Sequence, residues 1–276
     1  ITYGDWSSDV CSSDLENVVR NKVLNAKTPL NNAGAQPLIS VIIPAYNEAA
    51  YIKETVLSAQ AAAAEYRGPV EFIVVDNNSS DKTAEIARSL DVTVVFEPVN
   101  QIARARNAGA AAASGEYLVF VDADTCLQGD ILAKVAANLA SGNVIGGGAW
   151  VEPDSSAFSR FLFKYLVNFG LSLKNVSVGP FLYCEREAFC NAGGFDQELY
   201  AAEEFSLAEH MKTEGRKMNK KWKIIKHGRG HKIITSSRRF GRFGGLEMLF
   251  RNIHLLWKGG KKLRKKDQCS FWYQAR

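Results

Sequence analysis

The sequence lacks any apolar stretch long enough to cross a membrane. A membrane-spanning helix needs about 20 consecutive apolar residues, and the nearest candidate, FLFKYLVNFGLSL, is interrupted by Lys164 and Asn168. Cysteine is also scarce. Five cysteines without a CxxC pair favour a reducing cytoplasm over a disulfide-stabilised secreted scaffold. Hydrophobic residues make up 46% of the chain, which fits a soluble globular protein with a sizeable core.

Several nucleotide-binding and metal-binding motifs are absent as well. No G-x-G-x-x-G follows the first apolar strand, which argues against a dinucleotide-dependent dehydrogenase, and no G-x-x-x-x-G-K-[ST] phosphate loop occurs. Cys/His spacing typical of zinc sites is missing too. A nucleotide diphosphate would therefore be held by a metal ion rather than by a glycine cradle.

The first residues do not resemble part of a fold. DWSSDVCSSDL, residues 5–15, resembles the in-frame translation of a DNA sequencing adapter, so residues 1–15 are interpreted as an artefact. They also lack the apolar core of a signal peptide. We expect the natural start to be missing or displaced, and we interpret residues 16–36 as a lead-in to the first strand.

Positive charge is concentrated at the other end of the chain. The net charge is +5, but residues 212–276 contain 20 Lys and Arg against 3 Asp and Glu, which leaves −12 for the rest. Such asymmetry predicts an anionic partner for the basic end. Residues 241–276 form a basic amphipathic segment, since apolar residues recur there at helical spacing. That apolar face either packs on the domain or lies on an anionic membrane surface.

Nucleic acid is not an expected partner of the basic segment. It contains no recognised nucleic-acid-binding module, and it adjoins an acidic body. We therefore predict a cytoplasmic protein that is peripheral on the inner face of the cell membrane if the segment binds lipid.

From residue 37 onward, apolar runs alternate with helical patterns. Strands are predicted at 38–43, 71–76, 91–98 and 116–124, and helices at 48–64, 81–90 and 102–114. The following half is less regular, with a helix at 130–141, a strand at 143–151, an aromatic-rich segment at 157–173, a helix opening near 203, and short strands at 221–227 and 232–237. This alternation predicts an α/β fold with a mostly parallel sheet covered by helices on both faces.

Acidic side chains follow the predicted strands directly. Asp76 ends the second strand, and Asp122 and Asp124 follow the apolar YLVFV run. In parallel sheets the ligand crevice lies at the carboxyl ends of the strands. An Asp-x-Asp pair alone is often a solvated loop or a helix cap. Together with a third strand-end acid it favours Mg²⁺ or Mn²⁺, which bind one or two carboxylates plus substrate phosphates.

Four motifs occur in a specific order: SVIIPAYNEAAYI, VVDNNSSDKTAEIA, ARNAGAAAASGEYLVFVDAD and GGFDQELYAAEEFSL. In that order and spacing, the chain resembles a family-2 glycosyltransferase of the GT-A fold over about residues 38–240. The resemblance implies a catalytic domain at 37–240, divided into a nucleotide-binding half at 37–127 and an acceptor half at 128–240.

The resemblance also implies roles for individual residues on the donor side. Pro44, Tyr46, Glu48 and Asp76 would hold the base and ribose of a nucleotide-diphosphate sugar. Asp122 and Asp124 would bind ribose and metal, with Asp124 as the direct ligand. Arg106 would pair with a phosphate or with the acids; the alternative is an arginine on a helix surface.

On the acceptor side, the resemblance places the base on the second acid of a pair after G-G-F-D. Here the pair is Glu203-Glu204, where the family usually has an aspartate in the second position. Glu204 would take a proton from an acceptor hydroxyl during direct, inverting displacement at the anomeric carbon. The alternative is that both acids merely favour a helix N-terminus.

Two later residues are weaker candidates. TSSRRF would bring Arg238 or Arg239 to a diphosphate, because a guanidinium matches phosphate oxygens. His231 would complete the metal shell, as a late histidine does in some GT-A enzymes; a solvated histidine is the alternative. QCSFW, residues 268–272, departs from the Q-x-x-R-W of processive synthases at Phe271, which predicts addition of single sugars.

The expected function is metal-dependent transfer of one sugar, UDP-linked, to a glycan or lipid-linked acceptor. Two alternatives stay open. A polyprenyl-phosphate acceptor is already ionised and needs no base, whereas a nucleotide-sugar-binding protein without turnover would explain the unusual Glu-Glu pair.

Overall fold

The computed structural model describes residues 39–154, 168, 179–226, 228 and 230–238. No helix within these residues is long and apolar enough to cross a membrane. The adapter-like start, the lead-in at 16–36 and the basic segment 241–276 lie outside the described residues, as does most of the aromatic-rich segment. Those interpretations stay predictions, as does the division of the domain into two halves.

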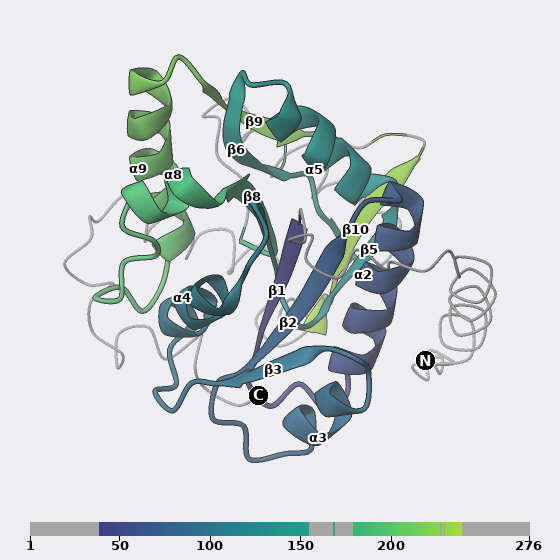
Figure 1. Ribbon diagram of the computed structural model, residues 1–276. Helices are drawn as coiled ribbons and strands as arrows, with labels where there is room; N and C mark the ends of the chain where they lie inside the picture. The colour runs from purple at the N-terminus through teal and green to yellow at the C-terminus, as the bar shows by residue number, and fades with distance from the viewer. Residues whose placement is uncertain (1–38, 155–167, 169–178, 227, 229, 239–276) are drawn as a thin grey trace, which may run out of the picture.

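Seven strands form the main sheet, in the order β3-β2-β1-β4-β8-β6-β9 (Figure 1). Their bounds are β1 Ile39–Ala45, β2 Val70–Asp76, β3 Thr93–Phe96, β4 Tyr117–Val121, β6 Val144–Ala149, β8 Phe181–Glu185 and β9 Lys221–Ile225. β8 runs antiparallel to its neighbours β4 and β6, whereas the other neighbouring strands are parallel. The predicted α/β fold with a mostly parallel sheet is confirmed.

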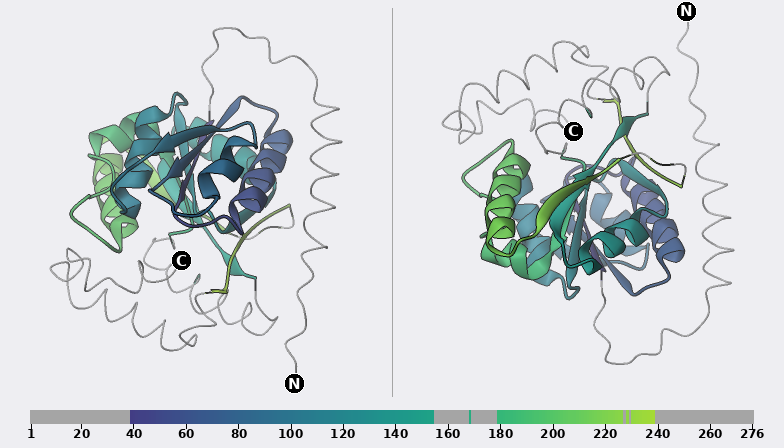
Figure 2. Two further views of the ribbon diagram at one scale, coloured as in Figure 1. Left: turned by 90° about the horizontal axis from the view of Figure 1, so that it is seen from below. Right: turned by 90° about the horizontal axis from the view of Figure 1, so that it is seen from above.

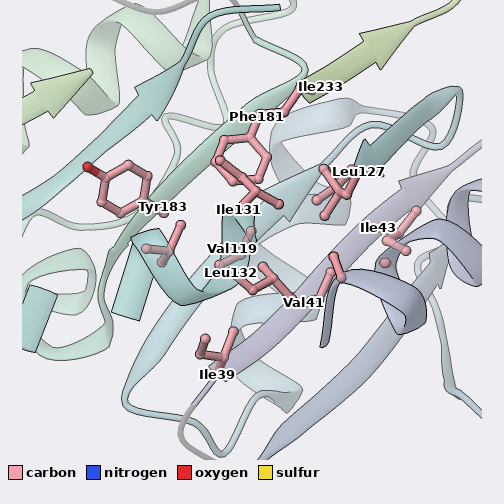
Figure 3. Packing of buried hydrophobic residues seen from close by; sticks show 14 of the residues in the cluster. Ile39, Val41, Ile43, Val119, Leu127, Ile131, Leu132, Phe181, Tyr183 and Ile233 are labelled. Carbon is pink, nitrogen blue, oxygen red and sulfur yellow. The ribbon is translucent and has the colours of Figure 1, made fainter. Parts of the chain in front are cut away.

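Helices cover both faces of this sheet, as the two views in Figure 2 show. One face carries α2 (Ile52–Tyr66), α3 (Thr83–Arg88) and α5 (Ile131–Ala140), and the other carries α4 (Ile102–Ala112), α8 (Arg186–Asn191) and α9 (Glu203–Lys217). Each face has its own apolar core. In the first, Ile39, Val41 and Ile43 of β1 pack with Ile131 and Leu132 of α5 (Figure 3). Burying each such side chain contributes about 1.5–3 kcal/mol.

The helix predicted at 48–64 begins later, at Ile52. Residues 47–51 instead form a turn, in which Asn47 has a φ of 52° and the Glu48 carbonyl accepts from the amides of Tyr51 and Ile52. Asparagine tolerates this left-handed conformation because its short polar side chain bonds locally. The turn leaves Glu48 at the carboxyl end of β1 rather than on a helix face.

Three consecutive glycines in β6 allow close packing in the second half of the sheet. A Cβ on Gly147 would lie 1.7 Å from the carbonyl oxygen of Lys223 in β9 and 2.8 Å from the hydroxyl of Tyr183 in β8. That buried hydroxyl donates to the same Lys223 carbonyl at 2.8 Å. Glycine is therefore required in β6 so that the Tyr183 side chain can bridge two strands across it.

A second, three-stranded sheet was not expected. It contains β5 (Thr125–Gly129), β10 (His231–Thr235) and β7 (Glu152–Pro153), in that order. β10 pairs antiparallel with β5, so that Thr235 lies opposite Thr125. The Ser236 amide then donates to the Asp124 carbonyl at 3.0 Å. This pairing brings the late segment 236–238 to the Asp-x-Asp turn that follows β4.

The strand order changes direction around β1. β2 and β3 lie on one side of it and β4 on the other, so the chain crosses over between them. A crevice outside the carboxyl ends of the strands at such a switch point is the usual ligand site of an open α/β sheet. The residues that follow β1, β2 and β4 are those selected from the sequence.

Candidate active site

The ends of β1 and β2 carry the first group of predicted residues. Pro44 is buried within β1, and Tyr46 lies half-buried in the turn that follows. Glu48 is 1% exposed, and its backbone amide donates to Thr83 Oγ1 at 2.8 Å. Asp76 is 5% exposed and its Oδ1 accepts from the Ser79 amide at 3.0 Å. The strand register places Asp76 opposite Ala45, so these residues share one edge.

Side-chain hydrogen bonds fasten the turn after β1 to the turn after β2. The Ser80 amide donates to Asn47 Oδ1 at 2.8 Å, and the Asn47 amide donates to Ser79 Oγ at 3.1 Å. The two turns therefore form a single polar wall at this end of the crevice. Such a wall can present backbone and carboxylate groups to a nucleoside.

Arg106 of α4 joins two of the predicted acids beneath the crevice. Its Nη2 donates to Asp122 Oδ1 at 2.9 Å and its Nη1 donates to Glu203 Oε1 at 2.8 Å. The guanidinium is 3% exposed and stacks 5.2 Å from the ring centre of Phe195. Of the roles considered for Arg106, the structure shows pairing with the acids. The surface-arginine alternative is wrong because the side chain is buried.

The neighbouring carboxylates keep the Arg106 guanidinium charged. Burial lowers the pKa of Arg106, but the negative charges of Asp122, Glu203 and Glu204 raise it beyond its ordinary value. Arg106 therefore stays protonated at any relevant pH. Glu203, whose side chain is 5% exposed, therefore has a permanent positive partner 2.8 Å away.

Glu204 is in a different state from its neighbour. Within the described residues it has no ion-pair partner, and its carboxylate lies against Gly179, where an added Cβ would be 2.5 Å from Oε1. Burial raises the pKa of Glu204, the adjacent Glu203 raises it further, and Arg106 only partly opposes them, so that the pKa reaches about 8. A carboxylate with a pKa near the working pH matches the requirement for a general base.

The helix that carries the two glutamates starts abruptly. Ala202, the residue before α9, has a φ of 60° and provides no side-chain cap. Left-handed backbone is unfavourable for alanine, at a cost of about 1–2 kcal/mol. The local sequence therefore does not itself favour this start. Contacts from elsewhere in the fold must hold Glu203 and Glu204 in place.

Arg238 links the donor-side group to the second acid of the Asp-x-Asp pair. One nitrogen, Nη2, donates to Glu48 Oε1 at 2.5 Å and to Asp124 Oδ2 at 3.0 Å. The guanidinium also stacks on Tyr51, 4.6 Å from the ring centre. The Ser237 amide donates to Asp154 Oδ1 at 2.5 Å, which holds the preceding backbone. The arginine thus lies beside Asp124, where a diphosphate is predicted.

Of the residues predicted for the site, His231 is the one that the structure places away from Asp124 and its neighbours. It begins β10 opposite Gly129, and Thr235, which lies beside the Asp-x-Asp turn, is four residues further along the strand. At about 3.3 Å per residue the separation along β10 is roughly 13 Å. His231 instead contacts the Lys226 carbonyl through Nε2 at 2.9 Å and Asp130 through Nδ1 at 3.2 Å.

The acids fit a metal ion that is completed by substrate rather than one enclosed by protein. Among the residues that the structure describes, no group of three or more His, Cys, Asp and Glu side chains could hold an ion. Asp124 has a side chain that is 10% exposed, and Asp122 is 28% exposed, at the same turn. One or two carboxylates with substrate phosphates are the usual ligands of Mg²⁺. These two oxygen-donor residues therefore fit the predicted divalent ion.

Sequence reasoning missed several residues that build the site. Tyr51 supports Arg238, and Gly179 both accepts a 3.3 Å hydrogen bond from Arg106 and borders Glu204. The Gly-Pro pair at 179–180 was a readable turn signal before a strand. Asn107 and Gln101, at and near the ARN stretch, contact the segment that leads to α9. No local pattern indicates those contacts, because their partners are about 90 residues away.

This fold places carboxylates and arginines together at the carboxyl ends of its parallel strands, where open α/β sheets usually bind their ligands. The family model for glycosyl transferase family 2 matches residues 40–182, which is more than half of the chain. The chain belongs to that family. The matched region covers all six residues predicted on β1, β2 and β4 and in the turns that follow them, together with Arg106, but ends before Glu203.

Relatives with curated names agree with this assignment. An uncharacterised glycosyltransferase of Haemophilus influenzae is 38% identical over 104 residues, which is 36% of this chain and 40% of that protein. The glycosyltransferase AglE of Haloferax volcanii is 31% identical over 182 residues, which is 59% of this chain and 57% of AglE. The chain thus matches about half the length of these relatives.

Solved structures show the same fold. TarS of S. aureus in complex with UDP-GlcNAc aligns with a TM-score of 0.55 at 22% identity, covering 72% of this chain and 58% of that one. The mannosyltransferase PcManGT of Pyrobaculum calidifontis in complex with GDP-Man and Mn²⁺ aligns with a TM-score of 0.53 at 20% identity, covering 95% and 78%. At these identities the likeness shows the fold, and the GT-A expectation is confirmed.

Proposed function

We propose that the chain transfers one sugar from a nucleotide-diphosphate sugar, UDP-linked, to an acceptor hydroxyl with inversion at the anomeric carbon. The observation that carries this proposal is the unequal state of the two adjacent glutamates. Arg106 neutralises Glu203, whereas Glu204 borders the Gly179 turn with a pKa raised to about 8. Glu204 is therefore the residue that can accept a proton.

The donor would lie across the carboxyl ends of β1, β2 and β4. Asp76 and the turn containing Tyr46 would meet the nucleoside, since they form one wall of the crevice. Arg238 would turn from Asp124 to the diphosphate, because a guanidinium binds phosphate oxygens in the same planar geometry as a carboxylate. TarS with UDP-GlcNAc and PcManGT with GDP-Man support a nucleotide-diphosphate sugar as the donor class.

Asp124, with Asp122, would hold a divalent ion next to the donor phosphates. PcManGT, solved in complex with GDP-Man and Mn²⁺, supports this assignment. The ion would supply neutralising charge for the diphosphate leaving group. Asp122 is already paired with Arg106, so Asp124 is the better direct ligand. In exchange, Asp124 would give up its contact with Arg238.

The protein's own contribution to the reaction is to hold and move one proton. Glu204 takes the proton of the acceptor hydroxyl while the oxygen of that hydroxyl attacks the anomeric carbon from the side opposite the diphosphate. Attack from that side in a single displacement inverts the configuration. Arg106 donates to both Glu203 and Asp122, so the carboxylates beside Glu204 are engaged in ion pairs.

A thermal-shift screen of nucleotide sugars, each with and without MnCl₂, tests the donor assignment. Ligands that bind only the folded protein raise its unfolding temperature according to their affinity. We expect selective stabilisation by one UDP-sugar that depends on Mn²⁺ and that is lost in Asp124→Asn. Stabilisation by GDP-mannose instead would correct the nucleotide, and equal manganese dependence in Asp124→Asn would refute the metal assignment.

A turnover assay on Glu204→Gln tests the chemistry. The amide is close in size but cannot accept the proton, so transfer to a hydroxyl should fall by about 10²–10⁴-fold. A variant that retains full activity would favour an ionised phosphate acceptor. Donor binding by the wild-type protein without product under any acceptor extract would favour a binding protein without turnover.

A further inference from the structure

The segment between α8 and α9, residues 193–202, delivers the two glutamates to the crevice. It contains no helix or strand, and it has left-handed backbone at Gly193, Gly194 and Ala202, with φ of 82°, 70° and 60°. The short-range hydrogen bonds include those of the Glu198 and Leu199 amides, which donate to Asp196 Oδ1 at 2.9 Å and to the Asp196 carbonyl at 3.2 Å. Contacts with neighbouring elements add to these in fixing the position of the segment.

Side chains of α4 make those contacts at successive points along the segment. Asn107 Nδ2 donates to the Phe195 carbonyl at 2.8 Å, and the Phe195 amide donates back to Asn107 Oδ1 at 2.9 Å. Gln101, at the start of α4, donates through Nε2 to the carbonyls of Gln197 at 2.6 Å and Leu199 at 2.9 Å. Arg106 then reaches Glu203 at the first turn of α9.

The Asn107 contact also determines the support under Arg106. Phe195 is 1% exposed, and its ring packs edge-on against Phe120 at a centroid distance of 5.0 Å. The same ring lies below the Arg106 guanidinium, 5.2 Å from its centre. Because Asn107 fixes both backbone groups of Phe195, it fixes the ring that supports Arg106, and through Arg106 the Glu203-Glu204 pair.

The fit between Asn107 and the segment is tight. A Cβ on Gly194 would lie 2.9 Å from Asn107 Oδ1 and 3.4 Å from the Phe189 ring. Glycine is therefore required here both for its positive φ and for this close approach. These close contacts favour one position of the segment over alternative positions.

We propose that Asn107 is a positioning residue for the base Glu204, acting through the Phe195 backbone and the Arg106 guanidinium. The identity of the base in this proposal rests on the proposed function. The positioning of residues 193–202 by side chains of α4 does not depend on that function. The rest of α9 is held separately, since Leu207 and Met211 are buried in the core of that face. Loss of the Asn107 contact should therefore free the first turn while the helix stays folded.

Asn107→Ala tests the proposal, with Asn138→Ala as its matched control. Asn138 also lies on a helix, α5, and has two side-chain hydrogen bonds, with Tyr183 at 3.1 Å and Lys223 at 2.7 Å. It contacts neither the segment nor the crevice acids. Both variants remove two hydrogen bonds from one asparagine, so a general loss of stability should affect them alike.

The first readout separates turnover from donor binding. Release of UDP from UDP-GlcNAc with MnCl₂ present should fall by about 10²-fold in Asn107→Ala, because a shift of about 1 Å in a reacting group costs that much. Binding of UDP with MnCl₂, measured by calorimetry, should stay within about twofold, since the donor contacts proposed for Asp76, Asp124 and Arg238 lie on other elements. Asn107→Asp keeps the acceptor for the Phe195 amide, so its rate of UDP release should fall less than that of Asn107→Ala.

The second readout needs no activity. Hydrogen–deuterium exchange of peptides covering residues 193–206 should accelerate in Asn107→Ala and stay at the wild-type rate in Asn138→Ala. If wild-type protein releases no UDP from any sugar nucleotide, the proposed function fails. Hydrogen–deuterium exchange alone then tests whether Asn107 holds the segment in position. Equal exchange of this segment in the two variants, or equal losses of UDP release, would overturn the inference.

Discussion

The titration of Glu204 provides a quantitative test of the site that requires no knowledge of the acceptor. Its pKa is about 8 in the folded protein against an ordinary value of 4.5, mainly because of burial and then because of Glu203. A raised acid pKa means that the folded state binds the proton more tightly than the unfolded chain does. The resulting stabilisation is complete below about pH 4.5 and is lost progressively as the pH rises to about 8.

Glu204→Gln removes this pH dependence, because the amide resembles the protonated acid and does not ionise. The stability difference between the variant and wild type should grow with pH by at most about 1.4 kcal/mol per unit between about pH 5 and 8. The span from 4.5 to about 8 sets an upper limit of about 5 kcal/mol. Water that reaches the half-buried carboxylate lowers that figure.

Urea unfolding of both proteins at half-unit steps from pH 5 to pH 9 measures the difference. We expect the variant to be more stable than wild type at pH 8 and nearly equal at pH 5. In wild-type protein, kcat/KM should rise about tenfold per pH unit and level off near pH 8, because only the ionised form acts as base. Parallel stability curves for the two proteins would show an ordinary pKa and would refute the reasoning about Glu204.

Three further predictions concern the neighbours of this carboxylate. Arg106→Met leaves the buried Glu203 carboxylate and the partly exposed Asp122 carboxylate without their counter-ion, so the free energy of unfolding in urea should fall by at most about 3–5 kcal/mol; an unchanged midpoint would contradict this ion-pair triad. Arg238→Ala removes a competing cation from Asp124, so calorimetry should show tighter binding of Mn²⁺ alone but weaker binding of UDP. Gly179→Ala should slow sugar transfer by the otherwise wild-type protein, because the added methyl group crowds Glu204. The same substitution should reduce the transfer rate less in Glu204→Asp, whose shorter side chain leaves room. Additive effects in this double-mutant cycle would contradict the contact.

Much of the first half of the fold was predictable because its strands are fully buried. YLVFV has no polar position, which predicts a strand covered on both faces, and β4 follows it at Tyr117–Val121. The acids Asp76 and Asp122 end such runs, so their placement at one edge followed from parallel topology alone. Here local pattern and tertiary structure agree.

The second half could not be predicted in the same way. β5, TCLQG, has a polar composition and acquires its partner β10 from about 105 residues further along the chain. β8 is inserted antiparallel between β4 and β6, and nothing in FLYCE indicates that order. The same limit applies to His231, whose register in β10 places it away from Asp124. Pairing over such distances depends on the whole fold rather than on local sequence.

The acid pair illustrates what the structure adds to a motif. Resemblance to the family assigns the base to the second glutamate, and the alternative is that both acids merely favour a helix N-terminus. Of the two glutamates, Arg106 hydrogen-bonds only to Glu203. Gly179 leaves space for the longer side chain of Glu204. The missing side chain at position 179 thus accommodates the extra methylene that distinguishes glutamate from aspartate. A glutamate at 204 and a glycine at 179 therefore form one structural solution, and the departure from aspartate does not by itself argue for a loss of turnover.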